Sequence, residues 1–246
     1  MSSGLMPYLG EFLGTAMLIL LGDGVVANVT LNRSGMKGAG SLQITIGWGL
    51  AVLLPLFIFG ASSGGHFNPA VTIALAIIEE FPWRMVPGYL VSQFSGAFIG
   101  ACLVFVLFKD QYKETSDPKV MRGTFCTNPA IRDDKRNLLC EIVGTFILVF
   151  AILGINQVKE TMLVGLNCFL VFAIIVSIGI SFGGLTGYAI NPARDTAPRL
   201  AYSVLPVPGK EDSDWGYAWI PVVGPFIGGT VAAIVYKILP WCQFHP

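Results

Sequence analysis

Residues 66–72 read His-Phe-Asn-Pro-Ala-Val-Thr and residues 188–195 read Tyr-Ala-Ile-Asn-Pro-Ala-Arg-Asp. The triplet Asn-Pro-Ala thus occurs in two apolar stretches, as Asn68-Pro69-Ala70 and Asn191-Pro192-Ala193. Asn is a preferred helix N-cap and Pro is favoured at the first helical position, so both triplets predict a helix start. The capping Asn keeps its NH₂ donors available, and the helix end carries roughly +0.5 elementary charge. Two such ends facing each other would place two donors in a positive field.

A third copy of the triplet lies in polar sequence and does not predict a buried helix start. Asn128-Pro129-Ala130 lies in a charged and polar stretch, where we interpret it as a turn in a loop. One isolated Asn-Pro-Ala favours an ordinary surface cap. The other two copies differ because apolar sequence surrounds them, which favours a joint role inside the protein.

The composition of the chain indicates a membrane protein. Of 246 residues, 54% are hydrophobic and 12% are charged, and the mean hydropathy is +0.68. A soluble domain carries about 25% charged residues. The zero net charge gives no indication of a nucleic-acid partner. The five cysteines, the last of them Cys242, form no C-x-x-C pair, and we expect no disulfide framework, metal site or cofactor. No Lys or Arg precedes the first apolar run, so we expect no signal peptide.

Long segments free of charge predict the membrane spans. A helix needs about 20 apolar residues to cross a bilayer, and six such spans are expected, at residues 7–29, 42–60, 84–107, 138–157, 162–182 and 217–238. Residues 69–78 are too few to cross, and the helix after Asn191 is expected to end before Pro206. Each of these short helices follows a glycine-rich segment, which predicts a re-entrant half-helix. Irregular backbone at membrane depth is tolerated only inside protein or beside a water-filled cavity.

The order of these elements repeats along the chain. Glu11-Phe-Leu-Gly14-Thr15 opens the first span, and Glu141-Ile-Val-Gly144-Thr145 opens the fourth. Residues 7–107 and 138–238 each contain span, span, glycine-rich re-entry, half-helix and span. An odd number of spans gives the halves opposite orientations, which is the inverted-repeat arrangement of transport proteins. The sequence therefore predicts one all-α channel domain over residues 1–246, with a polar connection at 108–137.

These motifs, with the approach Gly64-Gly65-His66-Phe67, resemble the aquaporin family in its glycerol-facilitator (aquaglyceroporin) branch over nearly the whole chain. The resemblance implies a homotetramer with one pore per subunit, in the lipid bilayer of the plasma membrane. It implies downhill passage of glycerol, small polyols and some water, with exclusion of ions and protons and no enzymatic activity. The narrowest point is implied at four positions, which are Trp48, Gly179, Tyr188 and Arg194.

Several residues bear on the choice of solute within that family. Gly179 stands where water-selective members usually carry His, and it would leave room for a larger solute. Asp195 after the pore Arg and Pro221-Val222 in the last span are typical of glycerol channels. Tyr188 departs from the Phe that glycerol facilitators commonly have, and its hydroxyl would narrow the opening or add a polar contact. The alternative is therefore a water-selective aquaporin. A structural or adhesive membrane protein with the same fold is a third interpretation.

Each proposed pore residue has an expected role. The rings of Trp48 and Tyr188 would contact the carbon edge of glycerol, while Arg194 donates to its hydroxyls and opposes cations. Asn68 and Asn191 would donate to the solute at the centre. Backbone carbonyls are expected to accept from the hydroxyls along the way, namely those of Gly64, Gly65, His66, Phe67, Tyr188, Ala189 and Ile190.

The remaining polar groups are expected to be structural. Glu11 and Glu141 match in the two halves, so we interpret them as ligands of the re-entrant backbone rather than a proton relay. Asp195 is expected to pair with its neighbour Arg194 or to cap the helix, and His66 to form a hydrogen bond near the pore. The orientation is contested. Seven basic residues in 109–137 favour a cytoplasmic location for this connection, whereas the family places it outside with both termini inside, and we follow the family.

Overall fold

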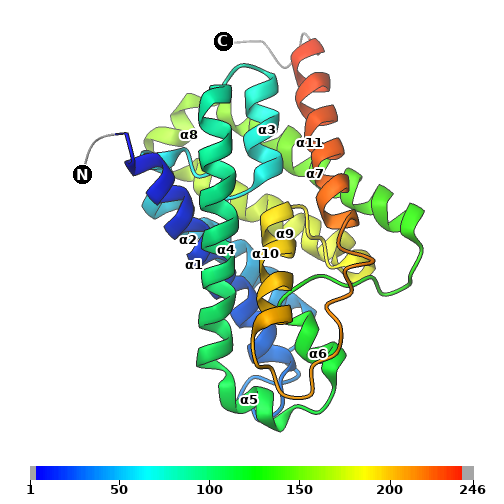
Figure 1. Ribbon diagram of the computed structural model, residues 1–246. Coiled ribbons are helices and arrows are strands. Elements are labelled where there is room, and N and C mark those ends of the chain that lie inside the picture. Colours follow the sequence, from blue (N-terminus) through cyan, green and yellow to red (C-terminus); the bar gives the residue numbers. More distant parts are fainter. Residues whose placement is uncertain (1–3, 240–246) are drawn as a thin grey trace.

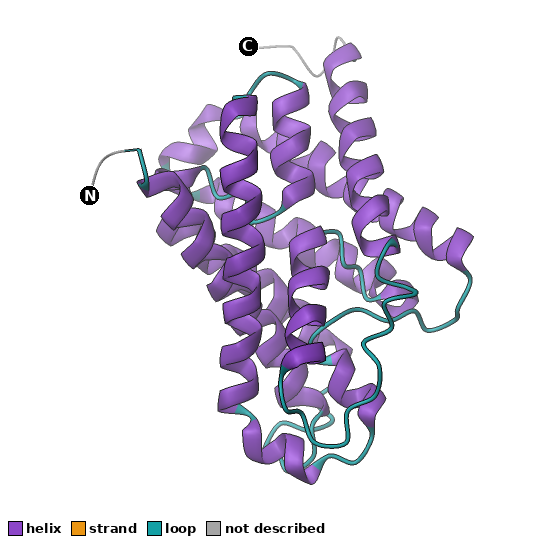
Figure 2. Cartoon of the chain, in the orientation of Figure 1, coloured by secondary structure: helices purple, strands orange, loops and turns teal. Residues whose placement is uncertain are grey.

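The computed structural model describes residues 4–239, so Cys242 and the first three residues lie outside the described part. Six helices are long and apolar enough to cross a membrane: α1 (Met6–Thr30), α2 (Ser41–Ser63), α4 (Val86–Leu107), α7 (Asp134–Asn156), α9 (Leu166–Thr186) and α11 (Ile220–Ile238). Two short helices, α3 (Pro69–Ile77) and α10 (Pro192–Val204), follow the Asn-Pro-Ala asparagines. Residues 4–239 contain no strand (Figure 2). The predicted all-α class with six spans and two half-helices is confirmed.

The span boundaries differ from the prediction by up to four residues, and α7 begins at Asp134 rather than residue 138. The fifth span begins at Leu166 rather than residue 162, because Gly165 takes a left-handed conformation (φ 72°) and separates α9 from the short α8 (Lys159–Leu163). The polar connection is also more ordered than a loop, since it contains α5 (Lys109–Glu114) and α6 (Pro118–Gly123). The one-turn helix η1 (Trp83–Met85) precedes α4. Asn128-Pro129-Ala130 lies outside every helix, as its polar surroundings indicate.

The two halves of the chain interlock through their half-helices. Helix α3 of the first half packs against α11 of the second, and α10 of the second half packs against α4 of the first. Helices α2 and α9, which precede the two re-entries, pack against each other. Figure 1 shows α3 beside the upper part of α4 and α10 beside its lower part. Helices α5 and α6 lie at the bottom of the view, at the end of the molecule away from the start of α1. The half-helices therefore approach each other from opposite sides.

Glycine pairs bring the long helices into close contact. A Cβ on Gly96 of α4 would lie 2.2 Å from the carbonyl O of Phe12 in α1, and one on Gly100 would lie 2.5 Å from that of Ala16. In the second half, a Cβ on Gly228 of α11 would lie 2.2 Å from the carbonyl O of Ile142 in α7. Small residues four apart let membrane helices pack backbone to backbone. The equivalent contact in both halves follows the repeat.

Charged side chains lie deep in this apolar fold. Six of them are at most 7% exposed, namely Glu11, Asp23, Glu141, Arg194, Asp195 and Arg199. An isolated charge at membrane depth is costly and usually has a partner and a function. These buried charges therefore indicate where the functional site lies.

Candidate functional site

The two Asn-Pro-Ala tips meet and bind each other. The side-chain oxygen of Asn68 accepts from Ala70 N (2.9 Å), and that of Asn191 accepts from Ala193 N (3.0 Å), so both asparagines are N-caps as predicted. The amide nitrogen of Asn68 donates to the carbonyl O of Ile190 (2.7 Å), and that of Asn191 donates to the carbonyl O of Phe67 (2.8 Å). Each NH₂ group has two donors, so one N–H of each asparagine is left for a solute.

A buried glutamate holds each re-entrant segment. Glu11 accepts from the backbone N–H of His66 (2.9 Å) and Phe67 (2.7 Å). Glu141 accepts from the N–H of Ala189 (3.1 Å) and Ile190 (2.8 Å). The side-chain contacts of both glutamates agree with the expected structural role. Gln93 supports Glu11 with a further hydrogen bond of 2.7 Å.

This arrangement aims a set of carbonyls away from the glutamates. In a trans peptide the N–H of one residue points opposite to the C=O of the residue before it. The peptides that donate to Glu11 and Glu141 therefore turn four carbonyls to the other side, those of Gly65, His66, Tyr188 and Ala189. The hydrogen bonds within residues 4–239 use none of these four. The carbonyls of Phe67 and Ile190, which we expected in the same ladder, already accept from the asparagines.

The repeated Glu-x-x-Gly motif has a second contact one turn further along the helix. A Cβ on Gly14 would lie 2.0 Å from the ring of Phe67, and one on Gly144 would lie 3.1 Å from Ile190 Cγ2. The glutamate thus binds the backbone of the re-entrant segment while the glycine accommodates its side chain. The motif positions the residue immediately before each capping asparagine.

The backbone of these segments is strained. Phe67, Tyr188 and Ile190 have positive φ angles of 46°, 39° and 44°. Bulky and β-branched residues rarely adopt this region, and such strain persists only where the surroundings impose it. The glutamates and the crossed asparagine bonds are the contacts that impose it here.

A cavity passes the point where the tips meet. Its volume is about 550 Å³, and its lining includes Trp48 and Arg194 on one side, Asn68 and Asn191 in the middle, and Asn156 beyond them. The residues with free carbonyls, Gly65, His66, Tyr188 and Ala189, also line it. Apolar side chains from both halves line the remainder, among them Leu18, Val52, Val71, Leu148 and Ile175. The lining therefore combines apolar side chains with hydrogen-bond donors and acceptors.

Three of the four expected constriction residues line this cavity, and two of them touch. The guanidinium carbon of Arg194 lies 3.9 Å from the ring centroid of Trp48. Arg194 Nη1 donates to Asp23 Oδ1 (3.2 Å) and to the carbonyl O of Phe125 (3.3 Å). A Cβ on Gly22 would lie 2.1 Å from the Trp48 ring. The neighbouring residues Gly22 and Asp23 of α1 therefore position Trp48 and Arg194.

Gly179 lies behind the Tyr188 ring, at a contact between α9 and α2. It does not itself line the cavity. A Cβ there would lie 2.5 Å from Thr45 Cγ2 and 2.8 Å from Tyr188 Cζ, and one on Gly183 would lie 2.9 Å from the Tyr188 ring. The space that these glycines leave is filled by Tyr188, whose hydroxyl lies on the Gly179 side. The absence of a side chain at Gly179 therefore leaves room for the Tyr188 ring to lie against α9.

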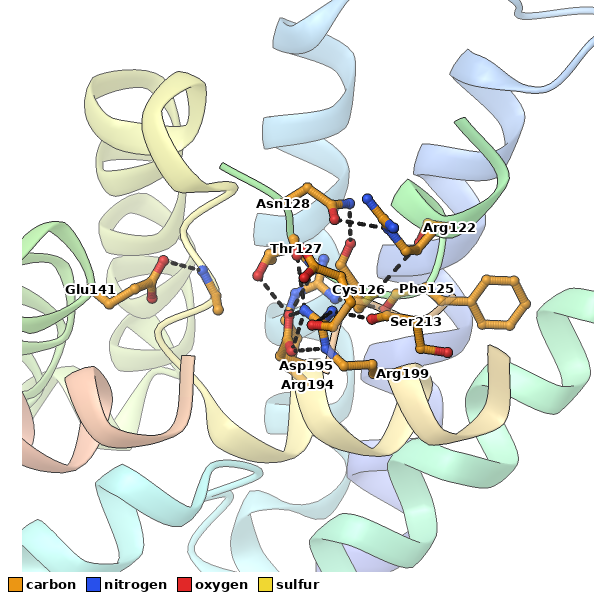
Figure 3. A network of polar contacts seen from close by, with 12 residues as sticks. Arg122, Phe125, Cys126, Thr127, Asn128, Glu141, Arg194, Asp195, Arg199 and Ser213 are labelled. Atoms are coloured by element: carbon orange, nitrogen blue, oxygen red, sulfur yellow. Dashed lines mark hydrogen bonds and ion pairs between the residues drawn. The ribbon is translucent and has the colours of Figure 1, made fainter. Parts of the chain in front are cut away.

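Asp195 does not pair with Arg194, which corrects our expectation. Asp195 accepts from Thr127 N (2.7 Å) and from Arg199 Nε (2.9 Å), and Arg199 donates on to the carbonyls of Thr127 and Ser213 (Figure 3). Arg199 is four residues after Asp195 in α10, so the two side chains share one face of the helix, and Asp195 pairs with Arg199 rather than with Arg194. The network ties the connection 108–137 to α10.

Cys126 and Arg132 are among the groups in that connection whose pKa values are shifted. Burial raises the pKa of the Cys126 thiol to about 12, so the thiol stays protonated at neutral pH. Hydrogen bonding to Asp214 raises the pKa of Arg132, which keeps its charge.

His66 is a structural hydrogen-bonding residue as expected, with Nδ1 3.0 Å from Thr72 Oγ1 and its ring against Phe81 and Tyr89.

Known proteins share this sequence and fold. The family described as "Major intrinsic protein" matches residues 2–236. The chain belongs to this family. It is 54% identical over 232 residues to a "Probable glycerol uptake facilitator protein" of Thermotoga maritima, covering 94% of this chain and 98% of that one. It is 48% identical over 231 residues to the "Glycerol uptake facilitator protein" of Streptococcus pneumoniae strain R6, covering 93% and 97%. The X-ray structure of the aquaglyceroporin from Plasmodium falciparum superposes with a TM-score of 0.81 at 32% identity, covering 96% of each chain.

Sequence reasoning missed three residues of the site. Asp23 and Arg199 are charges in apolar surroundings, and Gly22 adjoins the first of them. The high cost of a charge at membrane depth was the available signal, and it would have marked Asp23 as the partner of a buried cation. The pairing of Asp23 with Arg194 spans 171 residues and could be seen only in the folded chain.

Proposed function

We propose that this multi-pass membrane protein is a channel for the downhill passage of glycerol and similar small uncharged polyols, with some water, across the plasma membrane. Relatives with 48–54% identity over nearly the whole chain are named as glycerol uptake facilitators. The cavity supplies the matching chemistry.

The observation that carries the proposal is the lining of the cavity, which combines apolar side chains with hydrogen-bond donors and acceptors. Glycerol has a carbon edge and a row of hydroxyls. The ring of Trp48 offers an apolar contact, and Arg194 Nε and Nη2 retain N–H donors that no described residue accepts. The free carbonyls of Gly65, His66, Tyr188 and Ala189 follow as acceptors. Such a series replaces hydration in steps and leaves no single strong site to retain the solute.

The centre of the cavity opposes the passage of cations and protons. Both α3 and α10 direct their N-termini, the positive ends of their dipoles, at the centre. Asn68 and Asn191 each retain one donor there. A water molecule that accepts from both is poorly oriented to relay protons along a file.

The test is solute-specific swelling of vesicles that contain the purified protein. We expect glycerol entry well above that of protein-free vesicles, measured by light scattering after a glycerol gradient, together with water flow under a sucrose gradient. The entry of a larger polyol such as a hexitol, measured in the same way, tests the size limit of the channel. Water flow without glycerol entry would establish the water-selective alternative, and the absence of both would favour a structural or adhesive role.

We also propose that the protein forms homotetramers, each subunit with its own cavity. The support is the family resemblance and the apolar outer surface, on which Val91, Val106 and Leu163 are 64–86% exposed. Light scattering after size exclusion in detergent, with the detergent mass subtracted, measures the state. A monomer mass that persists in several mild detergents would contradict it. We likewise propose that the protein has no enzymatic activity.

A further inference from the structure

Asp23 is a buried carboxylate that contacts the constriction without lining the cavity. Its side chain is 1% exposed and that of Arg194 is 9% exposed, and the two are 3.2 Å apart. The second carboxylate oxygen of Asp23 is buried and has no hydrogen-bond partner among the described residues. An acid with only one used oxygen at membrane depth is expensive for stability alone. Its contact with Arg194 therefore requires a reason beyond packing.

Asp23 is the carboxylate that compensates Arg194. The other acid nearby, Asp195, is taken by Arg199 at 2.9 Å, and both of those side chains are fully buried. The four charges thus form two separate pairs. Without Asp23, one uncompensated positive charge would remain beside the cavity. Without Arg194, one uncompensated negative charge would remain.

The pair also fixes which donors of Arg194 face the solute. Asp23 and the carbonyl of Phe125 both accept from Nη1. The stacking of the guanidinium on Trp48 holds its plane. The N–H groups of Nε and Nη2 are left as the donors for a hydroxyl oxygen. Asp23 therefore acts on the solute through Arg194 and is a positioning residue.

We propose that Asp23 determines the charge selectivity of the constriction, because with Arg194 it presents an electrically balanced donor surface to neutral polyols. A close pair of opposite charges has a field that weakens with distance faster than that of a single charge. Removal of either partner turns the constriction into a site that attracts ions of the opposite sign. The inference rests on the proposed channel function and explains how that channel handles ions.

The experiment compares ion currents of four test variants and one control variant in planar bilayers with a KCl gradient at pH 8. We expect Arg194→Val to conduct K⁺, with a reversal potential towards that of K⁺. In Asp23→Asn/Arg194→Val this current should fall roughly tenfold, a barrier change of about 1.4 kcal/mol. Asp23→Asn alone should shift the reversal potential towards that of Cl⁻, whereas Asp23→Glu should keep the wild-type exclusion of ions. Arg132→Gln, which breaks a surface pair with Asp214, is the matched control and should show no ion current.

The outcomes separate this proposal from the function itself. Equal K⁺ currents in Arg194→Val and the double variant, or no current in Arg194→Val, would overturn the charge-balance proposal. A merely structural Asp23 would lower the yield of folded protein without reversing the ion preference, and size exclusion of each variant measures that yield. Glycerol swelling of wild-type vesicles tests the channel separately. If the wild-type protein excludes glycerol while the variants show the expected ion currents, the glycerol-channel proposal is refuted and the charge-balance proposal is supported.

Discussion

The ring of Tyr188 occupies its position because two residues of α9, Gly179 and Gly183, have no side chain. We predict that Gly179→Ala lowers glycerol flux more than water flux. The added methyl group would lie 2.5 Å from Thr45 Cγ2 and 2.8 Å from Tyr188 Cζ, and we expect the Tyr188 ring to give way towards the cavity that it lines. Overpacking of this kind costs roughly 1–3 kcal/mol, which a shift of the ring relieves. Stopped-flow light scattering of vesicles measures both fluxes.

The chain provides a matched control for that variant. Gly184 lies in the same helix, and a Cβ there has no atom within 4 Å. Gly184→Ala should therefore keep the wild-type ratio of glycerol to water flux. Equal ratios in Gly179→Ala and Gly184→Ala would contradict the role given to Gly179.

Individual site residues could be predicted from the sequence only where a motif marks them. Asn68, Asn191 and Arg194 follow from the paired triplets, and their positions in the cavity agree with the prediction. The function of Gly179 could not be deduced in full, because it depends on the rotation of the Tyr188 ring. Asp23 was visible as a charge in a span, but its partner lies in the other half of the chain.

The re-entrant segments depend on the glutamates of α1 and α7. We predict that Glu11→Gln and Glu141→Gln each lower the thermal stability of the protein. Gln offers one oxygen where Glu offers two, so one of the backbone N–H groups loses its acceptor and faces an NH₂ group instead. A hydrogen bond to a charged group contributes about 1.5–3 kcal/mol. Thermal unfolding in detergent, followed by tryptophan fluorescence, measures the loss.

A surface acid serves as the control for these two variants. Glu114→Gln changes a side chain that is 56% exposed and should leave the unfolding temperature near that of the wild type. Full stability of the Glu11 and Glu141 variants, combined with an altered pH dependence of transport, would favour the proton-relay interpretation instead.

The long helices are held by glycine contacts that can be tested in the same way. Gly228→Ala would place a methyl group 2.2 Å from the carbonyl O of Ile142 and should force α11 away from α7. Gly154→Ala, where a Cβ has no neighbour within 4 Å, should be neutral or slightly stabilising because Ala is the better helix former. We expect a lower unfolding temperature and reduced folded yield for Gly228→Ala alone. Similar behaviour of the two variants would show that α11 and α7 tolerate a wider spacing.

Elements were easier to predict than contacts. The bilayer requires long apolar segments, so the absence of charge marked the six spans directly. The start of α9 could not be predicted, because the left-handed turn at Gly165 interrupts an apolar segment without changing its composition. The helices α5 and α6 were missed because they are short and polar, and the tie between Arg199, Asp195 and Thr127 stabilises the connection that contains them.

At the scale of the whole molecule, the orientation in the membrane is open to a direct measurement. We predict that Ile131→Cys, at a position 79% exposed in the connection 108–137, reacts with a membrane-impermeant maleimide on intact cells. Trp83→Cys, at the opposite end of α4 and 57% exposed, should react only after the cells are opened. The wild-type chain gives the background from its own cysteines. The reverse pattern would place the connection in the cytoplasm, as the count of basic residues alone indicates.

Many of the basic residues in the folded connection have structural partners. Four of its seven basic residues form ion pairs, namely Lys113, Arg122, Arg132 and Arg136. Two of these pairs reach the segment before α11, at Glu211 and Asp214. Arg122 and Arg132 thus join two surface segments, in addition to any influence on insertion.

The exchange of hydrogen bonds between the two tips sets an order of assembly. During synthesis, the carbonyl of Phe67 enters the bilayer long before its donor exists, because Asn191 is added 124 residues later. The first half can insert its helices early, but its innermost turn keeps an unmet acceptor until the second re-entrant segment has been made. The centre of the channel therefore takes its final form only after Asn191 has been added, and a chain truncated before residue 191 would lack the donor that completes it.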